Sequence, residues 1–140
     1  MNYRRIALAA VGGTLAYFVA GLAMFILVPQ MVNEARKYTA VFRAQEEQMA
    51  RMPAIMAAIL VAVLVLAVLY AMTYRGGSGL AGGARFGALV GVFVVCAFVV
   101  HNYVNLNFGV TLMLMQAVAY FVEWSVVGTV IGLLYRVEVS

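Results

Sequence analysis

The chain has 140 residues, of which 66% are hydrophobic and only 10% are charged, and its net charge is +4. Soluble domains are closer to half apolar and a quarter charged, so this composition excludes an ordinary soluble domain and indicates a membrane protein. The single cysteine excludes an internal disulfide. The basic residues are scattered, without a stripe interleaved with aromatic residues, so we expect anionic lipid headgroups and no nucleic acid as their partner.

Four runs of the sequence are long and apolar enough to span a bilayer as helices, which requires about 20 residues. Backbone groups in lipid must be hydrogen-bonded within the segment, and the runs lack the alternation of a β-barrel. We therefore predict an all-α fold, an integral membrane four-helix bundle that forms one domain over residues 1–140. The predicted spans cover residues 6–28, 54–74, 84–106 and 109–135.

A polar segment, residues 30–53, separates the first two spans, and we predict that it is an amphipathic helix. The i,i+4 pairs of Arg43 with Glu47 and of Glu47 with Arg51 would lie on its exposed face. Two interpretations remain open: a connector on the bilayer surface or over the bundle, and a docking surface for another protein. The opposite stripe alternates spacings of four and three, and it consists of Met31, Ala35, Tyr38, Phe42, Gln45, Met49 and Met52.

The span boundaries carry breaker and turn residues. Pro29 fits a kink after the first span, and Pro53 fits a helix start. Residues 75–85, with the sequence RGGSGLAGGAR, are typical of a flexible link before the third span. Residues 105–109, NLNFG, indicate a tight polar turn, so the third and fourth spans should form an antiparallel hairpin.

Four spans place both termini on one side of the membrane. The basic residues on that side hug the helix ends, which favours a cytoplasmic location for both termini in a bacterial inner membrane, with dual topology as the alternative. The basic residues of the terminal side are Arg4, Arg5, Arg75, Arg85 and Arg136; those of the other side are Arg36, Lys37, Arg43 and Arg51.

Glycines recur at four-residue spacing in the last two spans. Small residues let helix backbones approach closely in lipid, where the hydrophobic effect does not drive association. These glycines therefore predict packing faces, either within the bundle or toward an oligomer or partner. They are Gly83, Gly87 and Gly91 in the third span and Gly128 and Gly132 in the fourth.

Polar residues inside membrane helices usually face the bundle or a cavity. His101 and Asn105 are about 40° apart on an α-helix and would share the glycine face of the third span. Gln116 and Glu123 are about 20° apart and would lie opposite the glycines of the fourth. His101 and Gln116 lie at similar depths, so we expect a hydrogen bond between them across the hairpin.

Glu123, within AYFVEWSVVG, lies close to the middle of the fourth span, and no span interior offers a lysine or arginine. An unpaired carboxylate is costly there, so we expect a neutral acid that is bonded to Tyr17 or to a backbone carbonyl. A contact with a partner subunit or cofactor is one alternative. A carboxylate that couples to protons or cations is the other.

His101 has three open interpretations: a hydrogen-bonded residue near the interface, a metal or porphyrin ligand, and a proton relay. Met113 and Met115 could add soft copper ligands beside it. However, one histidine and one cysteine at different depths do not make a zinc site, and no second axial haem ligand is evident. We therefore predict neither a bound metal nor a cofactor.

The stretch RGGSGLAGGARFGALVGVF, a polar end of the third span and FVEWSVVGTVIGLLY together cover residues 75–136. They resemble small four-helix bacterial membrane proteins of domain-of-unknown-function families, and this resemblance implies the architecture alone. Small multidrug transporters also have four helices and one membrane glutamate. Their acid lies in the first helix, whereas Glu123 lies in the last, and they lack the long polar segment.

No catalytic group is recognisable in the sequence: no serine lies at a familiar spacing from a base, and the glycine-rich link lacks the phosphate-loop lysine. We predict a non-enzymatic accessory or structural subunit of a larger membrane complex or of a homo-oligomer. A small proton-coupled transporter or channel that uses Glu123 is the first alternative. A haem- or pigment-binding membrane protein that uses His101 is the second.

Overall fold

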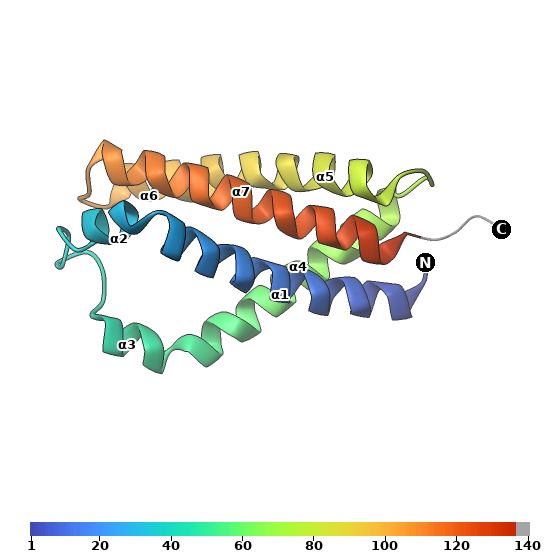
Figure 1. Cartoon of the computed structure of the whole chain (residues 1–140), viewed down its shortest axis with the longest axis horizontal. Helices are drawn as coiled ribbons and strands as arrows, with labels where there is room; N and C mark the ends of the chain where they lie inside the picture. The colour runs from blue at the N-terminus through green and yellow to red at the C-terminus, as the bar shows by residue number, and fades with distance from the viewer. Residues whose placement is uncertain (137–140) are drawn as a thin grey trace.

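The computed structural model describes residues 1–136, and these residues form helices and no strands. Four long helical stretches are apolar enough to cross a membrane, which confirms the predicted all-α membrane bundle (Figure 1). They are α1 (Tyr3–Leu27), α4 (Met52–Thr73), α5 (Gly79–Val94) with its continuations, and α7 (Val110–Tyr135). The continuations of α5 are the π-helix η1 (Val95–Val100) and α6 (His101–Asn105), while α2 (Pro29–Ala35) and α3 (Gln45–Ala50) lie in the connector.

Helix α7 is the centre of the packing. It lies against α5 on one side and against α1 on the other, and α4 packs mainly on α1. The third and fourth spans form the predicted antiparallel hairpin, and the start of α1 and the end of α7 lie at the end of the molecule opposite the connector (Figure 1).

The main cluster of buried residues lies in the half of the bundle near the start of α1 and the end of α7, which we call the closed half. The buried residues of α1 all lie before Thr14, and those of α4 all lie after Ala62. Toward the connector, no residue of α1 or α4 is buried, and α4 runs away from α6 and α7 (Figure 1). We call this second part the open half. The central core residues are Ile6, Ala9, Ala10, Val63, Ala67, Tyr70, Ala71, Val127, Ile131 and Tyr135.

The predicted glycine faces meet each other inside the chain. A Cβ atom on Gly83 would lie 2.5 Å from the carbonyl oxygen of Gly128, and one on Gly132 would lie 2.6 Å from the Cα of Gly83. A Cβ on Gly87 would lie 2.7 Å from two backbone oxygens of α7, and one on Gly91 would lie 3.0 Å from the ring of Phe121. The seam therefore joins α5 and α7 backbone to backbone.

The third span begins at Gly79, five residues before its predicted start, so most of the expected flexible link is helical. The Ser78 hydroxyl caps this helix and accepts from the backbone N–H three residues later at 3.3 Å. A Cβ on Gly79 would lie 2.4 Å from the carbonyl oxygen of Gly132. Close packing therefore outweighs the low helix propensity of glycine. The true link is short, with φ values of 90° and 97° at Gly76 and Gly77.

The connector is two short helices rather than one continuous amphipathic helix. Pro29 begins α2 after a break at Val28, and Pro53 lies in the first turn of α4, as expected for these residues. Residues 36–44 fold as turns and coil between α2 and α3. A straight helix would carry the stripe away from the bundle, whereas this break turns part of it inward.

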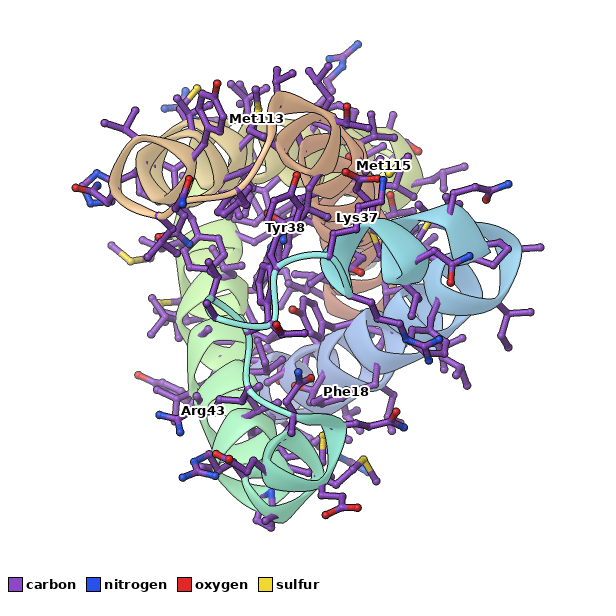
Figure 2. All side chains as sticks on the ribbon, turned by 90° about the vertical axis from the view of Figure 1, so that its left-hand side faces the viewer. Phe18, Lys37, Tyr38, Arg43, Met113 and Met115 are labelled. Carbon is purple, nitrogen blue, oxygen red and sulfur yellow. The ribbon has the colours of Figure 1, made fainter. Side chains whose placement is uncertain are left out.

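Two stripe residues of the connector pack over the turn between α6 and α7. The ring centroids of Tyr38 and Phe42 lie 6.4 Å and 6.1 Å from that of Phe108, which is buried. Figure 2 shows this end of the molecule, with Tyr38 near its middle. The contact favours the interpretation of a connector that lies over the bundle.

Candidate functional site at Glu123

Glu123 is the one charged residue that is buried in the described part of the chain, with 8% of its surface exposed. At 1.5 Å per residue, it lies about 20 Å along α7 from Val110 and about 18 Å from Tyr135. The carboxyl is therefore near the middle of the helix, where a charge is most costly in a bilayer.

Helix α1 supplies the surface that faces this carboxyl. A Cβ atom on Gly21 would lie 3.3 Å from Oε1 of Glu123, so the absence of a side chain at Gly21 makes room for the acid. Tyr17, one turn earlier on α1, and Tyr120, one turn earlier on α7, are close enough to interact electrostatically with Glu123. The acid thus lies between α1 and α7, away from the glycine seam with α5.

No hydrogen bond or ion pair reaches the Glu123 carboxyl from residues 1–136, so the expected bond to Tyr17 or to a backbone carbonyl is not made. The ion pairs of this part of the chain all lie in the connector. The hydrogen bond from Lys37 to Glu34 raises the pKa of the Lys37 amine. The predicted i,i+4 pairs are present: Arg43 to Glu47 at 3.2 Å and Arg51 to Glu47 at 3.7 Å.

A tryptophan next to the acid carries a second unsatisfied polar group. The indole N–H of Trp124 is buried without a hydrogen-bond partner in the described chain. Its ring packs against Tyr17, with 5.3 Å between the centroids, and the ring of Tyr17 packs edge-on against Phe18 at 5.5 Å. We call Tyr17, Tyr120, Glu123 and Trp124 the Glu123 cluster.

The Glu123 cluster lies where the closed half meets the open half. Toward the termini, the next inward residues of α7 are Val127 and Ile131, and both are fully buried. Toward the connector, Ala119 and Leu112 of α7 are still buried, but Tyr120 and Gln116 are only partly buried. The acid is therefore sealed on one side by the core and lies at the base of the less densely packed region on the other.

His101 and Asn105 do not share the glycine face, so that prediction is wrong. In a regular α-helix, Phe98, which follows Gly91 by seven residues, would lie on the same face as Gly91. Instead Phe98 is 48% exposed and Val99 is 1% exposed, because the π-helix η1 adds a residue to the turn and rotates everything after it. Both polar residues are exposed as a result. The Asn105 amide donates to the backbone oxygen of His101 at 2.8 Å.

The predicted bond between His101 and Gln116 is absent from the described chain, because the rotation turns His101 outward while Gln116 stays partly buried. Met113 and Met115 lie in the first turns of α7, at the end of the molecule seen in Figure 2. Within residues 1–136, no three His, Cys, Asp or Glu side chains come together as a metal site would require.

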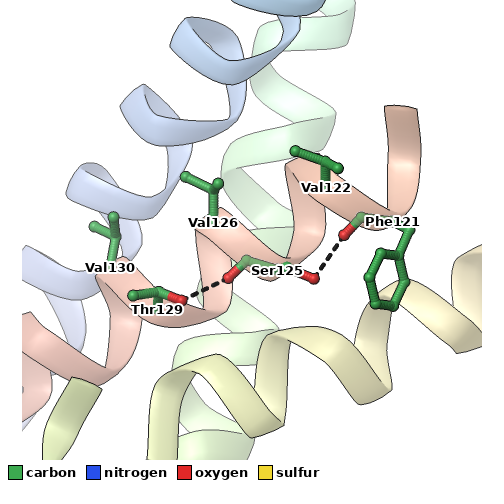
Figure 3. Close-up of a pocket in the computed structure, with 6 residues that line it drawn as sticks. All are labelled: Phe121, Val122, Ser125, Val126, Thr129 and Val130. Atoms are coloured by element: carbon green, nitrogen blue, oxygen red, sulfur yellow. Dashed lines mark hydrogen bonds between the residues drawn. The ribbon is translucent and has the colours of Figure 1, made fainter. Parts of the chain in front are cut away.

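A shallow groove on the outer surface of α7 offers a contrast to the Glu123 cluster (Figure 3). The hydroxyls of Ser125 and Thr129 donate to carbonyl oxygens one turn earlier, at 2.7 Å and 2.8 Å, so they are already satisfied. The groove is lined from this helix alone, by Phe121, Val122, Ser125, Val126, Thr129 and Val130. It offers an apolar surface without a reactive group.

Sequence reasoning found Glu123 and Tyr17 but did not assign Gly21, Tyr120 and Trp124 to the same site. Tyr120 precedes the acid by three residues and lies on the same side of α7, which was a usable signal. The position of Gly21 required the register between α1 and α7. Chemically, the cluster offers one carboxyl and three potential donors within an apolar bundle, and it has no nucleophile beside a base.

No protein-family model, curated protein or solved structure matches this chain. The resemblance of residues 75–136 to small four-helix bacterial membrane proteins therefore remains a prediction. The function is therefore inferred from the residues of the chain itself.

Proposed function

We propose that this chain is a small, non-enzymatic membrane protein that serves as an accessory or structural subunit, associated with other membrane subunits or with copies of itself. The open half is the observation that supports this function. None of residues 52–62 on α4 is buried, so half of this helix has little contact with the bundle. Membrane helices are stabilised mainly by van der Waals contact with other helices, and a helix from another subunit would supply it here.

The polar end of the third span supports the same proposal. His101 and Asn105 are exposed on the outside of the hairpin, and the imidazole has no partner in residues 1–136. Polar side chains on membrane helices usually face protein or water rather than lipid tails. A neighbouring subunit would satisfy them, as would the interfacial water near the helix end.

We place both termini in the cytoplasm and the protein in a bacterial inner membrane. The closed end carries arginines close to the helix ends, which favours the cytoplasmic side. Tyr74 and Tyr135 lie at the same end, with 5.7 Å between their ring centroids, where aromatic residues favour the membrane interface. Cysteine labelling from either side of intact cells tests this orientation.

The mass of the protein in mild detergent tests the association. After crosslinking in the membrane, light scattering should give a protein mass above that of one chain, or mass spectrometry should identify a constant co-purifying membrane partner. A strictly monomeric species without such a partner contradicts the proposed function.

Matched substitutions locate the surface. Val61→Trp adds bulk to the open half of α4, where Val61 is 61% exposed, and should weaken the association. Leu8→Trp adds the same ring to the outer face of α1 in the closed half, where Leu8 is 55% exposed, and should leave it unchanged. An association that survives Val61→Trp but not Leu8→Trp would contradict a role for the open half.

A further inference from the structure

The Glu123 cluster holds more hydrogen-bonding capacity than the chain satisfies. The residues Glu123 and Trp124 are each more than nine-tenths buried, and neither the Glu123 carboxyl nor the Trp124 indole N–H has a hydrogen-bond partner in residues 1–136. The hydroxyls of Tyr17 and Tyr120 beside them also have no hydrogen-bond partner within residues 1–136. Buried polar groups are ordinarily paired with protein, water or an ion, so this cluster is suited to bind something small and polar.

The charged groups around the Glu123 cluster determine which small polar species it can bind. Helix α1 presents Tyr17, and α7 itself presents Tyr120, while the titratable tyrosines of α4 lie in the closed half near Tyr135. On α5 and η1, Arg85 and Cys96 are exposed, and on α2 Glu34 pairs with Lys37. No described cation faces the acid. A buried carboxyl without a cation is neutral only when it holds a proton.

The burial of the inner faces decides from which side a proton arrives. Between the cluster and the termini, Val63, Val127 and Ile131 are fully buried and block that side. Between the cluster and the connector, Ala119 and Leu112 of α7 are still buried, but no residue of α1 or α4 is, and Ile59 on α4 and Met24 on α1 are partly exposed. The side of Glu123 that α1 and α4 leave less covered therefore opens toward the connector.

We propose that Glu123 is a proton-binding site that exchanges its proton with the aqueous phase on the connector side of the membrane. Such a site goes beyond an accessory or structural role, because it supplies the proton-binding step that movement of a solute coupled to protons requires. The hydroxyls of Tyr17 and Tyr120, which are close enough to interact electrostatically with Glu123, are the nearest donors available to the carboxylate once the proton leaves.

Infrared spectroscopy of the protein in liposomes tests the site directly. The wild type should show the carbonyl band of a protonated carboxyl, and the band should shift promptly when the liposomes are transferred to D₂O. The band should weaken as the pH rises, because release of the proton leaves a carboxylate. Glu123→Gln should abolish it, whereas the matched Glu47→Gln, which removes an exposed connector acid, should leave it intact.

The route is tested with a side chain placed beside the acid. Gly21→Leu fills the space next to Oε1 of Glu123 and should abolish the prompt shift in D₂O. Val19→Leu enlarges an outward residue of the same helix, 66% exposed, and should leave the exchange unchanged. Equal exchange in the two variants would overturn the connector-side route.

Two results on the wild type alone overturn the proposal, even if Glu123→Gln does not fold. One is the absence of a protonated-carboxyl band at every pH at which the protein is folded, because the acid would then be permanently ionised. The other is a band that stays unshifted after hours in D₂O, because the acid would then be sealed. A monomeric mass in detergent contradicts only the proposed association and leaves this exchange intact.

Discussion

The closed and open halves both consist mainly of apolar residues but differ in how they are packed. In the closed half, glycines bring α5 and α7 together backbone to backbone, and Val63, Val127 and Ile131 are fully buried. In the open half, α4 consists of apolar residues as well, yet none of residues 52–62 is buried. The boundary coincides with the aromatic rings around Tyr17 and Trp124. Apolar character thus places residues in the membrane, while shape decides which of them pack.

The two halves also differ in what they leave available. In the closed half the core side chains pack against one another, so this half contributes stability. The open half leaves the side of α4 and the approach to Glu123 uncovered, so partners, lipid and water have access to it. Stability and the proposed function are therefore separated along the length of the same helices.

The largest effect is expected from a side chain in the seam of the closed half. In Gly87→Leu, even the first carbon would meet two backbone oxygens at 2.7 Å, and backbone cannot move aside as a side chain can. We expect a loss of unfolding free energy of about 3 kcal/mol, the upper part of the range for overpacking. Unfolding followed by circular dichroism in detergent measures it. Gly21→Ala, which meets only a carboxyl oxygen, is the control and should lose much less.

The connector should loosen when the ring under it is removed. Phe108→Ala deletes the contact of Tyr38 and Phe42 with the turn between α6 and α7, and the change should cost about 3 kcal/mol locally. Trypsin should then cleave the connector after Lys37 faster than in the wild type. Phe93→Ala, on a ring that is 70% exposed, should not change the rate. Equal cleavage in both variants would mean that Phe108 does not hold the connector.

A third comparison uses neighbouring residues of one helix. Val63→Ala removes two methyl groups from the closed core and should lower the unfolding free energy by about 2 kcal/mol. Leu64→Ala, next in sequence but 42% exposed, should lower it by about 0.5 kcal/mol. Unfolding in mixed detergent micelles measures both. Similar losses would indicate that α4 is packed on all sides in the closed half, rather than on its inner face alone.

The smallest effect should be a gain in stability. The hydroxyl of Tyr70 is buried in the closed half without a hydrogen-bond partner in the described chain, while its ring packs against Tyr74, Phe86 and Tyr135. Tyr70→Phe keeps the rings and removes the unsatisfied hydroxyl, so the free energy of unfolding should rise by up to about 1 kcal/mol. A loss of stability in the same unfolding assay would show that the hydroxyl is bonded in the membrane.

The sequence by itself determined the four apolar helices and the hairpin of the last two, because length, hydropathy and turn residues are local properties. It also determined the connector pairs of Glu47, because residues four apart are neighbours on any helix. The glycine spacing predicted a close seam, although it left open whether the seam lay within the chain or between chains.

Only the tertiary structure decided the rest, because each remaining feature depends on what lies opposite. Gly79 is helical because it packs closely against Gly132, although glycine has a low helix propensity. The π-helix turns His101 outward, and nothing in VCAFVV announced the extra residue. Glu123 was visible as an isolated acid from the start. Its neighbour Gly21 and its place between a sealed core and an open side arise from the register of α1 on α7, which no single helix encodes.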